Sequence, residues 1–467
     1  MRKEYREYNF DAMAGSLLGI GAHLKDGTDK ECYGLLNYAP HFKEVIGAIL
    51  GAGEPGILFI KIAAKFVNTV LSAHDNGMKI CMGTFTMPPA IMKPFNVIPL
   101  WLEPVTCLGV LMWARGVNEY LNHCCELGMT ETACTGQRGA LGAYLAGLGV
   151  KPDFALSNCV GACDSNATAF NYAAEYLGIP FYQCNAVPLL ADERTYEYHR
   201  EDFRNLVAFI EEQTGKKMDI DILREVLLET DKQDKLMGEL QELMRIKPSP
   251  VPGVYAFLLY ALRFIYAGCP EGTELIESML RVSKKNLAEG RAGTSSGKED
   301  ARVIAIYIDH YAGQLKPWTY YDSKNISYLG GALDYFWHGH APYAKGLEEG
   351  TYKIDTSSVD AMFNSCADQM SRMPMVKQLR GPYDNPHMWR SDTMAMIRTY
   401  HPDFCTFTST VGCRNTWSAI KMLARDVEKA GIPAVILFGD SFDDRITSWE
   451  SMRDRLDEFI NVRGILK

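Results

Sequence analysis

Short apolar runs alternate with helix-like patterns in two separate parts of the chain. The first set of runs lies between residues 79 and 187 and the second between 301 and 440, with Gly, Pro and short polar turns around them. Strands that alternate with helices are typical of a parallel sheet covered by helices. The sequence therefore predicts an α/β protein with two parallel sheets. The predicted strands are residues 79–87, 96–105, 153–160, 179–187, 301–309, 324–331, 404–411 and 432–440.

The remaining segments have helical periodicity. Residues 192–298 combine dense charge with apolar residues at helical spacing, and the first 75 residues also have a helical pattern. A chain of 467 residues is too long for a single core. We therefore divide it into a helical N-terminal segment (1–75), a first α/β domain (76–191), a helical insert (192–298) and a second α/β domain (299–467).

Two stretches that are far apart in the chain run through the same steps. PDFALSNCVGAC begins at Pro152 and PDFCTFTSTVGC begins at Pro402, and each continues through a helical pattern to Gly-Ile-Pro and another strand. Cys163 and Cys413 end these two matching stretches, each at a strand-to-helix turn. Ligands bind at this edge of open α/β sheets, and a helix N-terminus favours a thiolate over a thiol. The two cysteines are therefore predicted to bind a ligand between two similar domains.

Cys134 joins this pair because it also precedes a helix-like stretch, which is rich in Gly and Ala. Three converging thiolates would suit an iron–sulfur cluster, and zinc is the competing metal. Structural zinc sites usually contain close pairs such as C-x₂-C, whereas the nearest spacing in this turn is the C-x₃-C of Cys159 and Cys163. We therefore expect a cluster.

Composition restricts the partners and the location. The 13 cysteines are an odd number, which argues against a disulfide framework. The adjacent Cys124 and Cys125 cannot both point one way on a helix, and we expect them to be structural. A net charge of −9 argues against a nucleic-acid surface. The chain has neither a signal-peptide-like start nor an uninterrupted apolar span of about 20 residues, so we expect a cytoplasmic protein with no membrane segment.

Phosphate-binding glycine motifs are missing. The segment GTSSGKED resembles a P-loop only loosely, because Lys298 is followed by Glu299 where Ser or Thr is required. We therefore expect no nucleotide site in this chain.

Five segments, taken in order, carry a family resemblance. They are TFTMPPAIMKPFNVIPLWLEP (84–104), ACTGQRGALGAYL (133–145), NCVGACD (158–164), VGCRNTWS (411–418) and IPAVILFGDSFDDRITSWESMRDRLDEF (432–459). With these segments the chain resembles, over roughly residues 75–467, the ATP-activated 2-hydroxyacyl-CoA dehydratases and the related ATP-dependent benzoyl-CoA reductase subunits. In the turn VGCRNTWS, Cys413, Trp417 and Ser418 match the family, whereas the residues after the cysteine depart from its usual Lys-Pro.

The resemblance implies two flavodoxin/Rossmann-like domains, an acyl-CoA substrate and a 4Fe-4S cluster on Cys134, Cys163 and Cys413. In such enzymes a separate ATP-hydrolysing iron–sulfur activator injects one electron. The thioester becomes a ketyl radical, and the neighbouring hydroxyl leaves as water to give an enoyl-CoA. Three ligands would leave one iron open to a substrate oxygen. The resemblance also implies a related second subunit, in a heterodimer or a homodimer. We therefore expect the iron–sulfur subunit of a 2-hydroxyacyl-CoA hydro-lyase.

Three alternatives stay open at this point. A benzoyl-CoA reductase-type subunit would make the protein an oxidoreductase. A non-catalytic relay subunit would carry electrons on a cluster with a fourth protein ligand, for which Cys159 is the candidate; Cys159 would otherwise serve a second cluster. A double-cubane reductase would use six cysteines, namely Cys134, Cys159, Cys163, Cys405, Cys413 and one of Cys124 and Cys125.

Glu103 is the candidate proton-transfer residue. It ends a predicted strand at the ligand-binding edge of the first sheet, where a carboxylate could act as a general acid or base. A salt-bridged loop glutamate is the alternative interpretation. Other polar residues have a suitable position, but capping, hydrogen bonding or packing explains them equally well. These weaker candidates are the pair His338 and His340, the pair Asp309 and His310, and Arg138, Arg414 and Trp417.

Overall fold

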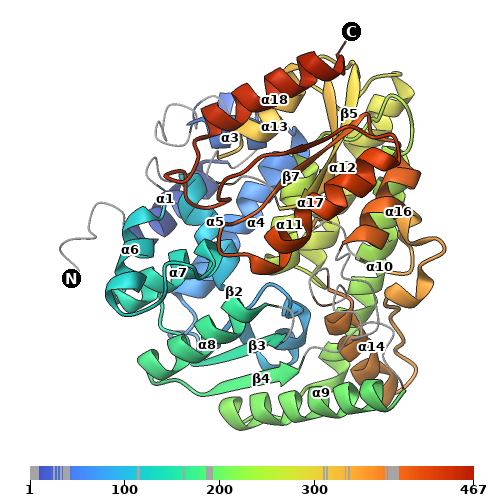
Figure 1. The fold of residues 1–467 in the computed structure, drawn as a ribbon. Helices are drawn as coiled ribbons and strands as arrows, with labels where there is room; N and C mark the ends of the chain where they lie inside the picture. Colours follow the sequence, from blue (N-terminus) through green and yellow to red (C-terminus); the bar gives the residue numbers. More distant parts are fainter. Residues whose placement is uncertain are drawn as a thin grey trace.

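The computed structural model contains two parallel sheets with helices around both (Figure 1). In the view of Figure 1 the strands of the first sheet lie in the lower part and those of the second in the upper part. The structure describes residues 10–24, 27–28, 30–31, 34, 43–112, 116–160, 163–185, 193–308, 311, 314–331, 333–334, 337–373, 376 and 389–466.

The two sheets have the same topology. The first has the order β2-β1-β3-β4 and the second the order β6-β5-β7-β8, and every pair of neighbouring strands is parallel. The predicted α/β class is therefore confirmed, although each strand is shorter than or equal to its predicted run. The strands are β1 (Lys79–Gly83), β2 (Val97–Trp101), β3 (Phe154–Val160), β4 (Phe181–Asn185), β5 (Ala301–Tyr307), β6 (Ile326–Gly331), β7 (Phe404–Thr408) and β8 (Ala434–Ile436).

Helices cover the sheets, as all-parallel sheets require. Every residue of β5, β6 and β7 is buried. The helices of the two α/β parts are α5 (Leu102–Met112), α6 (Asn118–Glu126), α7 (Thr135–Leu145), α8 (Asp164–Leu177), α13 (Lys316–Ser323), α14 (Val359–Ser371), α16 (Arg390–Tyr400), α17 (Arg414–Lys429) and α18 (Trp449–Arg463), with 3₁₀ turns η2 (Pro89–Phe95), η4 (Pro342–Ala344) and η5 (Glu348–Gly350).

The predicted strand 96–105 is too long. Strand β2 ends at Trp101 and α5 begins at Leu102, so Glu103 lies in the first turn of a helix. Pro104 does not prevent this, because an N–H in the first turn has no partner within the helix and its loss has no effect there.

The remaining helices lie outside the two α/β parts of the chain. They are α1 (Phe10–His23), α3 (Lys43–Leu50) and α4 (Glu54–Leu71) near the N-terminus, and α9 (Glu193–Thr214), α10 (Ile220–Met244), α11 (Tyr255–Ile265) and α12 (Pro270–Ala288) in the insert. Helix α11 contacts both β2 and β6, and Figure 1 shows α4 and α11 between the strands of the two sheets. None of the helices in the described part of the chain is long and apolar enough to cross a membrane.

Arg302 fastens the insert to the second sheet. Its side chain is 2 % exposed, and its guanidinium donates to the carbonyls of Tyr400 (2.6 Å) and Ile246 (3.0 Å). Its Nε lies 3.4 Å from Oε1 of Glu299, which is also buried. The Arg302 guanidinium, at the start of β5, therefore satisfies one carbonyl after α10 and another at the end of α16.

We expect Arg302→Met to lower the free energy of unfolding by about 3–5 kcal/mol, because it leaves the Glu299 carboxylate and several carbonyls buried without their partner. Urea denaturation measures this loss. Arg281→Met is the matched control, since Arg281 pairs with Glu54 where both side chains are 54 % exposed. That variant should lose less than about 1 kcal/mol. Similar small losses in both variants would contradict the structural role of Arg302.

Candidate functional site

The candidate site lies where the strand order reverses in both sheets. In the first sheet the reversal falls between β1 and β3, and in the second between β5 and β7. Ligands of open α/β proteins bind at the carboxyl ends of strands at this position. Cys163 follows β3 and Cys413 follows β7. The repeat in the sequence therefore corresponds to equivalent positions in two equivalent sheets.

Three cysteines line one cavity at this position, each at the start of a helix. Cys134 is the N-cap of α7, Cys163 of α8 and Cys413 of α17, as the helical patterns in the sequence predict. Both α/β parts contribute to the cavity, and aromatic side chains close part of it. Its lining also includes Phe85, Glu103, Gly136, Gln137, Asp164, Asn166, Tyr260, Tyr307, Ile308, Leu333, Thr410, Gly412, Arg414 and Phe442.

Direct contacts hold the three cysteine turns together. The backbone N–H of Cys134 donates to Oγ of Ser165, 3.3 Å away in α8. Asp164 and Arg414, the residues after Cys163 and Cys413, form an ion pair across the domains. A Cβ atom added at Gly412 would lie 2.6 Å from the backbone nitrogen of Cys134. Only glycine at position 412 therefore allows the Cys413 turn to approach the Cys134 turn this closely.

Asp440 contacts both the Cys134 turn and the Cys413 turn. Its carboxylate accepts hydrogen bonds from Oγ1 of Thr135 (2.6 Å) and from the backbone N–H of Val411 (2.7 Å). Burial raises the pKa of Asp440, and these donors oppose that effect. The carboxylate thus joins the first turn of α7 to the turn that carries Cys413.

Each sulfur has a polar neighbour. Sγ of Cys134 lies 3.4 Å from Oγ1 of Thr410, and Sγ of Cys163 accepts from the N–H of Asn166 at 3.4 Å. Sγ of Cys413 lies 3.2 Å from the Tyr307 hydroxyl and 3.1 Å from that of Thr416. Hydrogen bonds to cysteine sulfur tune the potential of iron–sulfur clusters. The surroundings thus suit sulfurs that carry negative charge.

Tyr307 has a strained backbone at the end of β5. Its φ is 85°, a region that a bulky residue rarely adopts. Burial raises the pKa of Tyr307 well above its usual value, and the nearby cysteines raise it further. The hydroxyl therefore keeps its proton and can donate to a thiolate. Strain of this kind persists where the surroundings enforce it, often at functional sites.

Burial disfavours the free Cys134 thiolate. It raises the pKa of Cys134 to about 12, with smaller contributions from Cys413 and Asp440, and outweighs the hydrogen bond with Thr410. The helix N-terminus therefore does not by itself offset the effect of burial at Cys134. Cys134 would therefore form a stable thiolate only with a bound cation, because metal binding displaces the proton of a thiol.

The three cysteines are the residues of this cavity that could hold a metal group. No three His, Cys, Asp or Glu side chains in the described ranges lie close enough together to hold one metal ion. An iron–sulfur cluster takes its thiolates on different irons, and Cys134, Cys163 and Cys413 are the residues that could supply them.

Glu103 reaches the same cavity from the first turn of α5. It is 5 % exposed, and it accepts from Oγ1 of Thr84 and the N–H of Phe85, each at 3.3 Å. The amide of Gln137 also donates to it. Burial raises the pKa of Glu103 to about 7, although hydrogen bonds from its own backbone N–H, Gln137, Asn166 and the N–H of Phe85 lower it. The carboxyl can therefore change its protonation state near neutral pH.

Two amide oxygens near Glu103 lack a hydrogen-bond donor. Oε1 of Gln137 and Oδ1 of Asn166 are buried, and neither has a partner in the described part of the chain. Both side chains line the cavity. Buried acceptors of this kind are normally satisfied, so they suit a ligand that carries a donor.

Several sequence candidates lie away from the cavity. His338 is buried and neutral, and burial lowers its pKa to about 3, whereas His340 pairs with Asp231 at the surface. Arg138 donates to the Ala133 carbonyl and to Sγ of Cys125 behind the Cys134 turn. Cys124 and Cys405, two buried cysteines of the double-cubane alternative, do not line the cavity either. Asp309, His310 and the side chain of Cys159 lie outside the described residues.

Arg414 and Trp417, in contrast, belong to the site. Arg414 lines the cavity, and the Trp417 indole N–H donates to the Thr410 carbonyl at 2.6 Å, which fastens the Cys413 turn. Sequence reasoning missed several other residues of the site. The turn motif could have identified Thr410 and Thr416, but no local pattern indicated Tyr307, Gln137 or Asn166.

Comparison with known proteins relates the chain to dehydratase components. A match of 24 % identity over 244 residues links the chain to the "(R)-phenyllactyl-CoA dehydratase alpha subunit" of Clostridium sporogenes, and it covers 50 % of this chain and 58 % of that protein. The chain thus matches less than two thirds of the relative's length. The family model "2-hydroxyglutaryl-CoA dehydratase, D-component" matches residues 84–462. Because this match spans most of the sequence, the chain belongs to the 2-hydroxyglutaryl-CoA dehydratase D-component family.

Proposed function

We propose that this chain is the iron–sulfur subunit of an ATP-activated radical 2-hydroxyacyl-CoA dehydratase. The convergence of Cys134, Cys163 and Cys413 on one cavity carries the proposal. Family membership supports a dehydratase component, and the three cysteines would hold a 4Fe-4S cluster. Such a cluster supplies low-potential electrons and, with three protein ligands, a Lewis-acidic position that is open to a substrate oxygen.

Glu103 is the proposed proton acceptor. Its partners donate to it: Thr84, Phe85, Gln137 and Asn166. They favour the carboxylate form, which takes a proton, over the acid form, which gives one. A pKa near 7 also matches a base to neutral conditions. The residue would remove a proton from the acyl chain after the hydroxyl has left.

The neighbouring amides orient the substrate in this proposal. The free oxygens of Gln137 and Asn166 accept the hydrogen of the 2-hydroxyl group, and each side chain is fixed in place by its hydrogen bond to Glu103. Phe85, Tyr260 and Phe442 exclude water from this part of the cavity. A dry site strengthens the interactions between charges and dipoles that hold the substrate.

The electron must come from another protein. The chain has no phosphate-binding motif, so an ATP-hydrolysing iron–sulfur activator is proposed as the donor. The relative in Clostridium sporogenes is described as an alpha subunit, which supports a related second subunit here. An electron-relay role would instead move catalysis to that subunit. The iron content of the Cys159→Ala variant separates the relay role from the catalytic role, because a relay cluster would have a fourth protein ligand.

We expect Cys134→Ala, Cys163→Ala and Cys413→Ala each to lose most of the iron, because each thiolate contributes to binding. Iron and sulfide analysis with EPR under anaerobic conditions should give about four irons per wild-type chain. Cys405→Ala is the control, since Cys405 is buried within β7 away from the cavity.

The same measurement tests the alternatives. Equal iron loss from Cys159→Ala would show a fourth ligand or a second cluster, and about eight irons would support the double cubane. Wild-type protein that binds no iron would contradict the proposal.

Glu103→Gln should lower turnover by about 10²–10⁴-fold while it keeps the cluster, because it removes a base and no ligand. The wild-type rate should rise with pH through about 7 as Glu103 becomes a carboxylate. This dependence should disappear in the variant. A wild-type rate that falls through the same range would show that Glu103 acts as an acid instead.

The same substitution should change the pH dependence of stability. Since the folded pKa of Glu103 is about 7 and its ordinary value 4.5, the folded state binds an extra proton between these values. Wild-type stability therefore falls as pH rises through this window, by about 3 kcal/mol from this residue. Glu103→Gln should lack that loss in urea denaturation at pH 5 and pH 8. An identical pH dependence in both proteins would contradict the raised pKa.

Turnover of a 2-hydroxyacyl-CoA should require both ATP and an added iron–sulfur activator, because this chain lacks a nucleotide loop. Anaerobic assays that omit each component in turn measure the requirement. Sustained turnover by the purified chain with a chemical reductant alone would contradict it.

A further inference from the structure

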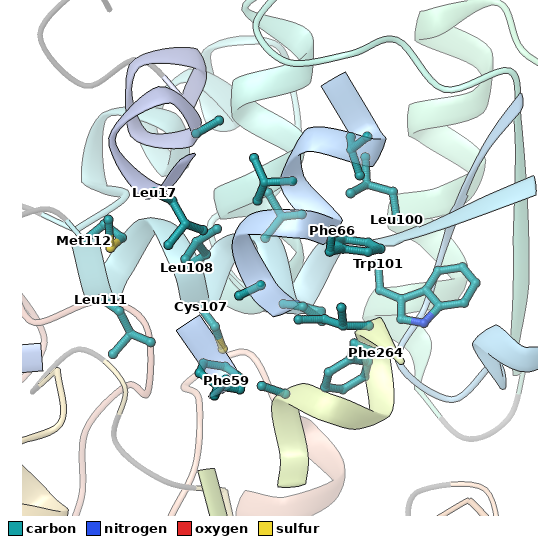
Figure 2. A pocket seen from close by; sticks show the side chains of 18 of the residues that line it. Leu17, Phe59, Phe66, Leu100, Trp101, Cys107, Leu108, Leu111, Met112 and Phe264 are labelled. Atoms are coloured by element: carbon teal, nitrogen blue, oxygen red, sulfur yellow. The ribbon is translucent and has the colours of Figure 1, made fainter. Parts of the chain in front are cut away.

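A second cavity, of about 220 Å³, lies beside the cysteine cavity. Helices α1, α3 and α4 form one wall, and β2, α5 and α11 form the other (Figure 2). No charged side chain is among the described residues that line it. The lining is aliphatic and aromatic, and it includes Leu17, Phe59, Phe66, Leu100, Leu108 and Phe264.

The two cavities share a wall. Tyr260 of α11 lines both of them. On α5, Glu103 faces the cysteine cavity, whereas Pro104 and Cys107 line the apolar one. The Arg263 guanidinium lies 5.1 Å from the centre of the Tyr260 ring and supports it from its own helix. A group bound at Glu103 is therefore about one helical turn away from the apolar cavity.

This apolar cavity is large enough to hold a ligand group. Protein interiors are packed closely and contain few voids larger than a water molecule. An engineered cavity of about 150 Å³ lined by similar side chains stays dry and binds benzene. The cavity here is larger, so it has room for a phenyl ring or a branched alkyl group.

We propose that the apolar cavity receives the side chain of the 2-hydroxyacyl group, so that the substrate is an aryl or branched-chain 2-hydroxyacyl-CoA. This inference rests on the proposed dehydratase function. The thioester and the 2-hydroxyl occupy the cysteine cavity, and the hydrocarbon passes Tyr260 into the space between α4 and α5. A dicarboxylic acyl group is excluded, because its second carboxylate would be buried without a partner.

The selective wall comes from the N-terminal segment. Helices α1, α3 and α4 end before residue 84, where the family match begins. The cysteine turns and Glu103 all lie within the match. Residues such as Ala63 and Phe66 therefore set which substrate side chain fits. They are separate from the residues that perform the chemistry.

Binding of three CoA thioesters to the purified full-length chain, measured by anaerobic calorimetry, tests the proposal. We expect 2-hydroxy-3-phenylpropanoyl-CoA to bind roughly 10- to 100-fold more tightly than 2-hydroxypropanoyl-CoA, the gain expected for burying a phenyl group. The dicarboxylic 2-hydroxypentanedioyl-CoA should bind no more tightly than the short ester. Binding of the dicarboxylic ester as tight as that of the aryl ester would overturn the proposal.

Substitutions that fill the apolar cavity provide a second test of the proposal. Ala63→Phe fills it from α4, and Ala261→Phe fills it from α11. Either should remove the preference for the aryl ester over the short ester. Ala288→Phe makes the same change at an exposed position in α12 and should keep the preference. Thermal unfolding shows which variants fold, and a preference that persists in both folded cavity variants would contradict the assignment.

Failure of the inference differs from failure of the dehydratase proposal. Turnover with equal binding of aryl and short esters would overturn the side-chain assignment alone. Selective binding of the aryl ester without loss of water would support the cavity assignment and overturn the dehydratase. The absence of binding by all three thioesters would overturn both.

Discussion

The close approach of the Cys413 turn to the Cys134 turn is the constraint on which the site depends. A side chain at Gly412 would collide with the backbone of Cys134, so the contact needs a residue without Cβ. The Asp164–Arg414 pair and the bonds to Asp440 hold the same junction from two other sides. Because the cysteines come from both α/β parts, the site exists only while the two sheets keep this relative position. Helix α11, which contacts strands of both sheets, and the hydrogen bonds of Arg302 help to maintain that relative position.

Burial has two chemical effects around this junction. It raises the pKa of the Cys134 thiol to about 12 and that of the Glu103 carboxyl to about 7. The first effect makes the site dependent on a cation, because without one the sulfur keeps its proton. The second gives the carboxyl a useful affinity for a proton at neutral pH. The same buried surroundings thus keep the Cys134 sulfur protonated unless a cation binds it, and they allow Glu103 to change its protonation state near neutral pH.

Local patterns in the sequence predicted the strands, the helices after them and the three cysteines at helix starts. The repeat from Pro152 and Pro402 identified equivalent turns because parallel sheets place equivalent strand ends alike. The sequence did not predict that β2 stops at Trp101, since Pro104 suits a strand end and a first helical turn equally. It also gave no sign of Tyr307 or Gln137. Their roles depend on contacts between distant segments, which no local pattern records.

Tyr260 connects the chemistry of the site with its selectivity. It belongs to α11, which contacts strands of both sheets, and its ring forms part of both cavities. A shift of α11 would therefore move the wall of the cysteine cavity and that of the apolar cavity together. The walls made by α1, α3 and α4 differ, because none of the residues described in these helices lines the cysteine cavity. Changes in those helices can thus alter which side chain fits while the cysteines and Glu103 keep their positions.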